Sequence, residues 1–222
     1  MRDLGGLPTV DGGETRFGAI VRADSIRGLT DRGWEALVDY GIRSAIDLRA
    51  DDEVAEDPPG AAPIPVVRVP IVPWETTLAH DWPSMREGYL VLLDQFRTQF
   101  ARAVREIGVA DGPVVIHCQG GRDRTGLVVA LVLRLAGVNP ETIADDHARS
   151  DESWAPLIEQ WFAEAPDEPE RERRRRIAAP AGRTMAEILE EIDRRYGGVD
   201  EYLRGGGASE EALSRLRGTL NG

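Results

Sequence analysis

The clearest structural signal in this chain is the stretch Val114-Val115-Ile116-His117-Cys118-Gln119-Gly120-Gly121-Arg122-Asp123-Arg124-Thr125-Gly126. It begins as a short β-branched strand, turns through two glycines and leads into the apolar segment 127–136, which is typical of a buried helix. A strand, a tight loop and a helix in succession indicate a parallel sheet covered by helices. Sites in such folds lie beyond the carboxyl ends of the strands. We therefore expect the functional site in the loop 118–124.

The loop 118–124 has the composition of an anion cradle. Its glycines allow backbone conformations that turn successive N–H groups inward, and the helix expected from Thr125 adds the positive end of its dipole. Arg124 carries a planar guanidinium that can hold two phosphate oxygens at once. Besides Arg124, the residues predicted to bind phosphate through this loop are Gln119, Gly120, Gly121 and Arg122.

Cys118 is the only cysteine of the chain, so an intramolecular disulfide is impossible. The groups that attract a phosphate would also stabilise its thiolate. A thiolate beneath a bound phosphate can attack the phosphorus in line, which gives a phosphocysteine that water then hydrolyses. We expect His117 to orient the cysteine and the Thr125 hydroxyl to stabilise the sulfur as it leaves. A buried structural thiol is the alternative, and the combination of strand, cysteine, glycine loop, Arg124 and helix disfavours it.

The leaving oxygen needs a proton, and three carboxylates could supply it. Asp123 lies inside the loop, Asp47 ends an apolar strand at the edge where the site is expected, and Asp81 precedes the next helix. We rank them in this order.

Both leading carboxylates have a structural alternative. Asp123 could orient only Arg122 or a backbone amide, and Asp47 could form an ion pair with Arg49 or Arg22. The sequence therefore predicts Asp123 and Asp47 as catalytic candidates and leaves the choice between them open.

Strands and helices alternate along the rest of the chain, which predicts an α/β fold with a mostly parallel central sheet flanked by helices. Strands are expected at 19–22 and 42–48, and an edge or irregular strand at 64–72, which two prolines interrupt. The acidic segment 51–60 is expected to be a loop. The expected helices are 31–40 capped by Thr30, one long helix at 83–107, a helix from Asn139-Pro140, a helix from the capping box Thr184-x-x-Glu187 to Gly197-Gly198, and a helix after Ser209.

Composition predicts a single globular domain over residues 1–222, because no linker divides the chain. The sequence has no apolar run that could cross a bilayer and no signal-like stretch at 1–13. We therefore expect a cytoplasmic protein without stable membrane insertion. Secretion without a leader peptide is left open. A net charge of -12 opposes non-specific binding to nucleic acid. His80 and His147 lack metal-ligand spacing and the reaction needs no metal, so no metal or cofactor is expected. The oligomeric state is not indicated.

The arrangement His-Cys, five residues, Arg and Thr at 117–125 resembles the signature of cysteine-dependent tyrosine and dual-specificity phosphatases. More narrowly, the chain is similar to a family of bacterial tyrosine phosphatases over nearly its whole length. The matching segments outside the loop are Arg2-Asp3-Leu4-Gly5-Gly6, Gly41-Ile42, Ile46-Asp47-Leu48-Arg49, Tyr202-Leu203 and the helix at 210–216. The resemblance implies the cysteine phosphatase fold with a helical lid around 151–183, and it supports Asp123 as the acid.

Two residues depart from the pattern of the resembling family. That family usually has Ala where Gly120 stands and Lys where Arg122 stands, and its Lys is associated with phosphoinositides. All 27 basic residues of this chain are Arg. Arg122 alone therefore predicts no change of substrate.

The predicted function is hydrolysis of phosphomonoesters on a phosphorylated protein or small molecule, with phosphotyrosine the first choice. Phosphoserine or phosphothreonine, phosphoinositides and inositol pyrophosphates follow it. A rhodanese-like sulfurtransferase, which also has a loop cysteine after a parallel strand, is one alternative. A non-catalytic phosphate-binding module is the other.

Overall fold

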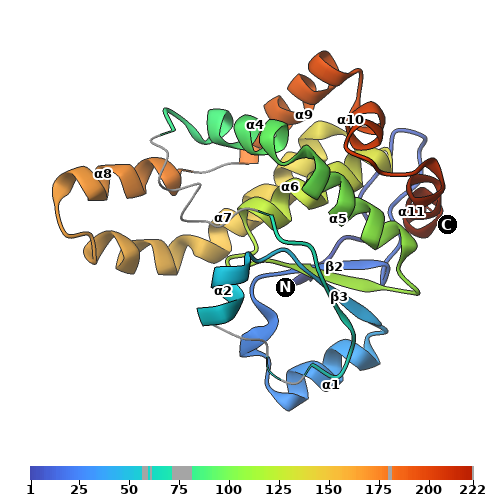
Figure 1. Cartoon of the computed structure of the whole chain (residues 1–222), viewed down its shortest axis with the longest axis horizontal. Coiled ribbons are helices and arrows are strands. Elements are labelled where there is room, and N and C mark those ends of the chain that lie inside the picture. The colour runs from blue at the N-terminus through green and yellow to red at the C-terminus, as the bar shows by residue number, and fades with distance from the viewer. Residues whose placement is uncertain (57–59, 61, 72–81, 180–181, 222) are drawn as a thin grey trace.

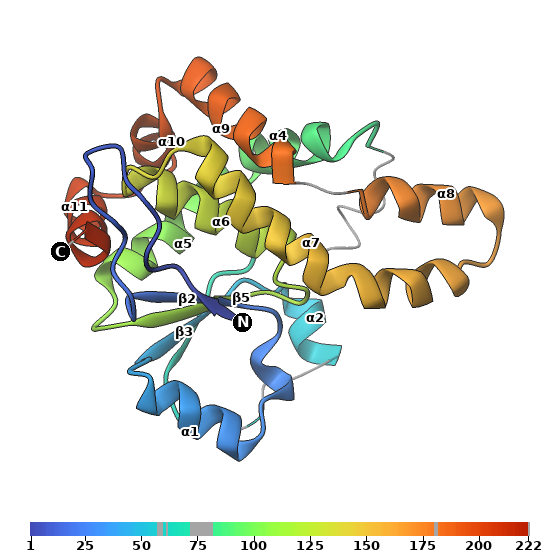
Figure 2. The ribbon, with the colours of Figure 1, turned by 180° about the vertical axis from the view of Figure 1, so that it is seen from behind.

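The computed structural model describes residues 1–56, 60, 62–71, 82–179 and 182–221. Within these ranges, five strands form one sheet in the order β1-β2-β5-β3-β4 (Figures 1 and 2). Four of the strands run parallel, and only β1 is antiparallel to its neighbour β2. The strands are β1 (Arg2–Asp3), β2 (Ile20–Ala23), β3 (Ser44–Asp47), β4 (Val66–Arg68) and β5 (Val114–His117). The predicted α/β fold with a mostly parallel sheet is confirmed.

The two faces of the sheet are covered unequally. α1 (Asp31–Asp39) and the short 3-10 helix η1 (Ile26–Gly28) cover one face, where a small apolar cluster forms. Most other helices pack over the opposite face around the main core (Figure 1). They are α4 (Met85–Gln95), α5 (Arg97–Val109), α6 (Asp123–Leu135), α7 (Pro140–Ala163), α9 (Gly182–Tyr196), α10 (Val199–Gly205) and α11 (Glu210–Asn221). The end of α7 and α8 (Glu168–Ile177) project beyond this layer as a helical hairpin.

β5 is the central strand of the sheet, as its sequence predicted. Val114 and Ile116 belong to the main core, whereas Val115 between them belongs to the small cluster on the opposite face. This alternation follows from the two-residue period of a strand, and burial on both sides explains why the strand is apolar throughout. In the ladder, Ala23 of β2, His117 of β5 and Asp47 of β3 stand side by side. The carboxyl ends of three strands therefore meet at one edge.

Predicted helix starts are confirmed by capping hydrogen bonds. The Thr30 hydroxyl accepts from Gly33 N at 3.2 Å, the Asn139 side chain accepts from Thr142 N at 2.8 Å, and the Ser209 hydroxyl accepts from Ala212 N at 3.3 Å. Each bond satisfies an N–H group that the first turn of a helix leaves free. The edge strand predicted at 64–72 is also confirmed, in a shorter form, as β4.

Three predictions for the helices and loops were wrong. The segment 51–60 is not all loop, because α2 (Asp51–Glu56) forms there with an acidic first turn that favours a helix N-terminus. The helix predicted at 83–107 is two helices, α4 and α5, separated at Phe96, whose φ of -112° and ψ of 26° leave the helical range. α9 begins at Gly182, so Thr184 is not its cap. The apolar spacing continues across Phe96, which hid the break.

No helix in the described part of the chain combines the length and the apolarity that crossing a membrane requires.

Candidate active site

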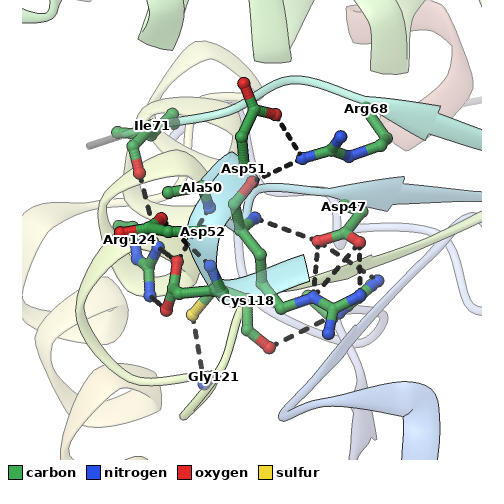
Figure 3. Close-up of polar contacts among 12 residues, drawn as sticks. Asp47, Ala50, Asp51, Asp52, Arg68, Ile71, Cys118, Gly121 and Arg124 are labelled. Atoms are coloured by element: carbon green, nitrogen blue, oxygen red, sulfur yellow. Dashed lines mark hydrogen bonds and ion pairs between the residues drawn. The ribbon is translucent and has the colours of Figure 1, made fainter. Parts of the chain in front are cut away.

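The loop after β5 lies at the edge where β2, β5 and β3 end. Gly121 in this loop has a φ of +66°, and a Cβ built on it would lie 2.5 Å from the Ala23 carbonyl oxygen. No other residue type would fit this conformation and this close approach. Gly121 N donates to Cys118 Sγ at 3.2 Å, so the loop curls back over its own cysteine (Figure 3). Cys118 is almost fully buried, with an exposed fraction of 3%.

A pocket opens above Cys118. It is formed by three parts of the chain that are distant in sequence, namely the loop, the end of β2 with the N-terminal residues, and one face of α7. Its lining residues are Met1, Arg2, Arg22, Ala23, Asp24, Cys118, Gln119, Gly120, Gly121, Arg122, Asp123, Arg124, Ser150, Ser153 and Trp154. The structure therefore brings Cys118, Arg124 and Asp123 together around one cavity.

Arg124, in the first turn of α6, is held by a glutamate that sequence reasoning missed. Its Nη1 donates to Glu53 Oε2 at 2.5 Å and its Nη2 donates to Glu53 Oε1 at 2.6 Å. Burial alone would lower the pKa of Arg124, but the hydrogen bonds to Glu53 and the electrostatic interactions with Cys118 and Glu53 outweigh burial and raise it. Figure 3 shows Arg124 beside Cys118 at the loop. Its guanidinium is therefore charged and fixed in orientation.

Asp123 begins α6 and faces the pocket. The hydroxyl of Tyr89, on α4, donates to Asp123 Oδ1 at 2.5 Å. Burial and the neighbouring Asp123 raise the pKa of Tyr89 well above its usual range, so this hydroxyl keeps its proton. Arg122 Nη1 lies 3.7 Å from the same oxygen. The carboxylate of Asp123 is thus held at the pocket wall by a neutral donor and a nearby cation.

Asp47 lies at the end of β3 and does not line the pocket in the described part of the chain. It forms a buried ion pair with Arg49, whose Nη2 donates to Asp47 Oδ2 at 2.7 Å. Burial alone would raise the pKa of Asp47, but the hydrogen bonds from Arg49 and the nearby His117 lower it. This arrangement matches the ion-pair alternative that its sequence left open. Asp81, the third candidate acid, lies outside the described residues.

His117 and Thr125 flank the loop from inside the protein. His117 is fully buried, with Nδ1 3.4 Å from the Cys118 carbonyl oxygen and Nε2 3.8 Å from Asp47 Oδ1. Burial lowers its pKa, which favours the neutral ring. The buried Thr125 hydroxyl has no hydrogen-bond partner among the described residues. Gln119, in contrast, is exposed at the pocket mouth.

Arg122 ties the loop to α7 and to the segment after α8. Its Nε donates to Asp151 Oδ1 at 2.7 Å, and its Nη2 donates to the Ala179 carbonyl oxygen at 2.5 Å. Only 1% of the residue is exposed. The structure therefore assigns the guanidinium of Arg122 to contacts that hold the loop against the helical hairpin.

A buried network behind the loop was also missed. Arg22 Nη2 donates to the Gly121 carbonyl oxygen at 2.8 Å, and its Nη1 donates to Asp146 Oδ2 at 2.8 Å. Arg2 Nε donates to Asp146 Oδ1 at 2.7 Å. The sequence held one signal for this network, which is Arg22 inside the apolar strand β2. A buried arginine requires a partner of opposite charge. Nothing in the sequence pointed to Asp146.

Within the described ranges, no cluster of three or more His, Cys, Asp or Glu side chains could hold a metal ion.

Comparisons with known proteins show the family of the chain. The model of a family described as the tyrosine phosphatase family matches residues 1–222. The chain is 31% identical to the triple specificity protein phosphatase PtpB of Mycobacterium tuberculosis, over 93% of this chain and 92% of that protein. It is also 31% identical to a tyrosine-protein phosphatase of Nostoc commune, over 90% of this chain and 73% of that protein.

Proposed function

The chain belongs to the tyrosine phosphatase family, and we propose that it hydrolyses phosphomonoesters through a phosphocysteine intermediate on Cys118. The observation that carries the proposal is the position of Cys118 Sγ. Cys118 lines the pocket, and its Sγ accepts a hydrogen bond from Gly121 N and lies beside Arg124. These groups stabilise a thiolate and also bind a phosphate dianion. One cradle therefore supports both reactants.

In the first step, the Cys118 thiolate attacks phosphorus and forms a sulfur–phosphorus bond. The phosphorus–oxygen bond of the ester breaks, its electron pair goes to the leaving oxygen, and Asp123, which enters this step as the protonated carboxylic acid, donates its proton to that oxygen and becomes a carboxylate. Arg124 and the loop amides stabilise the charge that spreads over the phosphoryl oxygens in the transition state. The alcohol or phenol then leaves through the pocket mouth.

In the second step, water attacks the phosphocysteine, and the electron pair of the sulfur–phosphorus bond returns to Cys118. The Asp123 carboxylate, now acting as base, takes a proton from that water. The Thr125 hydroxyl, which has no other partner among the described residues, can donate to the departing sulfur. Inorganic phosphate is released and the thiolate is regenerated, with no metal in either step.

Phosphotyrosine is the substrate we propose first, because both relatives are named for protein or tyrosine phosphatase activity. Phosphoserine, phosphothreonine and phosphoinositides are the other esters to compare. We also propose that residues 1–222 act as one phosphatase domain in which the end of α7 and α8 serve as a lid around 151–183. The bond from Arg122 to Ala179 supports this role because it joins the lid segment to the loop. Cytoplasmic location stays a prediction from composition.

The test compares the unmodified protein with Cys118→Ala and Cys118→Ser on para-nitrophenyl phosphate in the presence of a chelator. We expect turnover by the unmodified protein only, and a covalent phosphoenzyme after acid quench that neither variant forms. Phosphate release by Cys118→Ala at the unmodified rate would contradict the mechanism.

Asp123→Asn and Asp47→Asn form a matched pair that identifies the acid. General acid catalysis contributes about 10² to 10⁴-fold, and it matters most when the leaving oxygen is basic. We expect Asp123→Asn to lose far more activity on phenyl phosphate than on para-nitrophenyl phosphate. Asp47→Asn should affect both substrates alike, because Asp47 pairs with Arg49 away from the pocket. The reverse pattern would assign the acid to Asp47.

A further inference from the structure

The two adjacent glycines of the loop are required for different reasons. At Gly121, the positive φ and the close approach of the Ala23 carbonyl oxygen both exclude a side chain. Gly120 has no positive φ, so its backbone would accept a side chain. The three atoms nearest to a Cβ built on Gly120 all belong to the Trp154 ring, with Cζ2 only 2.2 Å away. It is therefore the indole of Trp154 that excludes a side chain at position 120.

The Trp154 ring is fixed against the loop. Its Nε1 donates to the Gly120 carbonyl oxygen at 2.8 Å. Three residues earlier on the same face of α7, Asp151 accepts from Arg122 Nε at 2.7 Å. The first bond holds the indole against the loop, and the second holds the same face of α7 against the loop. Among the described residues that line the pocket, Trp154 is the only aromatic one.

We propose that Trp154 forms the wall of the pocket against which the aryl ring of an aromatic phosphate ester packs, so that Trp154 selects aryl over alkyl phosphates. The inference rests on the proposed function, because a phosphate in the cradle directs its ester group towards the pocket mouth. Aromatic rings pack on one another with a gain beyond the area that they bury, whereas a seryl or threonyl ester offers no ring. Gly120 is the residue that gives the indole its place.

The test uses two peptides of identical sequence that carry phosphotyrosine or phosphoserine at the same position. The readout is the ratio of the two kcat/KM values. In Trp154→Leu the ratio should fall by about threefold to tenfold, the range that an aromatic pair contributes. In Trp154→Phe most of it should remain, because a ring is still present. The inhibition constant for inorganic phosphate should change less than about twofold in both variants, which shows that the cradle is intact.

Trp161→Leu is the matched control. Trp161 lies on the same helix, packs against Phe162 and carries the Arg174 guanidinium over its ring, and it does not line the pocket. Its replacement should leave the peptide ratio unchanged. A fall in the ratio as large as that of Trp154→Leu would overturn the inference.

A double-mutant cycle tests the role of Gly120 independently. In the unmodified protein, Gly120→Ala should displace the indole and lower the ratio as Trp154→Leu does. In the Trp154→Leu background, the same change should have little further effect on the ratio. If the unmodified protein cleaves neither the peptides nor para-nitrophenyl phosphate, the proposed function fails. If it cleaves them and Trp154→Leu keeps the full ratio, the function stands and the role of Trp154 is refuted.

Discussion

Arg124 and Glu53 form a buried pair beside the loop that contains Cys118. Both oxygens of Glu53 accept from the two terminal nitrogens of Arg124, and both residues are buried. A long cationic side chain loses rotamer entropy when it binds a ligand. The bidentate bond to Glu53 already fixes the rotamer of Arg124 in the free protein, so substrate binding costs less entropy. Glu53 is therefore a positioning residue for Arg124.

Glu53→Gln should lower kcat/KM by about tenfold to a hundredfold, because a charge-assisted bond to a buried cation is replaced by a weaker one. The inhibition constant for inorganic phosphate should rise in parallel, because in the proposed mechanism Arg124 binds both the substrate and the product phosphate. Glu56→Gln is the control on the same helix, because Glu56 is exposed. Equal phosphate inhibition of Glu53→Gln and the unmodified protein would show that Arg124 needs no such partner.

Tyr89 holds the other side of the pocket through its bond to Asp123. Tyr89→Phe removes that bond and leaves the ring in place, so we expect kcat/KM on phenyl phosphate to fall by about tenfold. The loss on para-nitrophenyl phosphate should be smaller, because that leaving oxygen needs less help from an acid. Tyr202→Phe is the control, since the buried Tyr202 hydroxyl donates to the Leu93 carbonyl oxygen away from the pocket. Equal losses on both substrates would mean that Tyr89 only stabilises the fold.

The sequence predicted the site residues that lie close together along the chain and missed those whose partners are distant in sequence. Cys118, Asp123 and Arg124 belong to one loop, and local spacing placed them in one pocket. Glu53 lies 71 residues from Arg124, and Tyr89 lies 34 residues from Asp123. These contacts depend on how α2 and α4 pack, which no local pattern encodes. Because 51–60 was expected to be a loop, Glu53 was not considered as a site residue.

At the scale of elements, the fold was predictable where one signal dominated. β5 was clear from its β-branched run, and α1, α7 and α11 were clear from their caps. The predictions failed where two signals overlapped, as at Phe96, where apolar spacing continues through a break between α4 and α5. α10 was not predicted, because it has only seven residues and the glycines on both sides of it are typical of turns. Short elements of this kind depend on tertiary packing more than on their own sequence.

Asp146 on α7 joins three elements, because it pairs with Arg2 of β1 and with Arg22 of β2. Burial lowers the pKa of Arg22, and Asp146 opposes that shift. Asp146→Asn would leave two arginines without their counter-charge, one of them fully buried. We expect the free energy of unfolding to fall by about 3 to 5 kcal/mol.

Urea denaturation at neutral pH measures this loss. Asp145→Asn is the matched control, because Asp145 is the exposed neighbour on the same helix. Since Arg22 also donates to the Gly121 carbonyl oxygen, the Asp146 variant should lose activity at temperatures where it remains folded. A stability within about 0.5 kcal/mol of the unmodified protein would refute this role for Asp146.

In the whole molecule, four arginines gather at one pocket of an acidic protein. The net charge is -12, yet Arg2, Arg22, Arg122 and Arg124 all line the pocket. Each is paired with a carboxylate behind or beside the pocket. The pairs keep the arginines in place, and the loop amides and helix α6 add further positive potential for the substrate. Such fixed charges need little rearrangement when a phosphate binds.

The same concentration of cations affects how the stability of the whole protein depends on pH. His147 packs against Gly126 of α6 and is buried, with neither ring nitrogen hydrogen-bonded in the described part of the chain. Burial and the charges of Arg22 and Arg122 lower its pKa to about 3. In the unfolded chain its pKa is about 6.5. Between these two values the unfolded state binds one more proton, so acid favours unfolding.

We therefore expect the free energy of unfolding to fall by about 2 kcal/mol from pH 7 to pH 5 because of His147 alone. His117, whose pKa is also lowered, adds a loss of the same sign. Asp47 and Asp146 have lowered pKa values, so their stabilisation is lost only below about pH 4, outside this window. Denaturant unfolding of the protein and of His147→Leu at both pH values isolates the effect, because only the difference between the two pH values is compared. The change in the free energy of unfolding between pH 7 and pH 5 should be smaller by about 2 kcal/mol in His147→Leu. An equal change in both proteins would mean that His147 is protonated in the folded state as readily as in the unfolded chain.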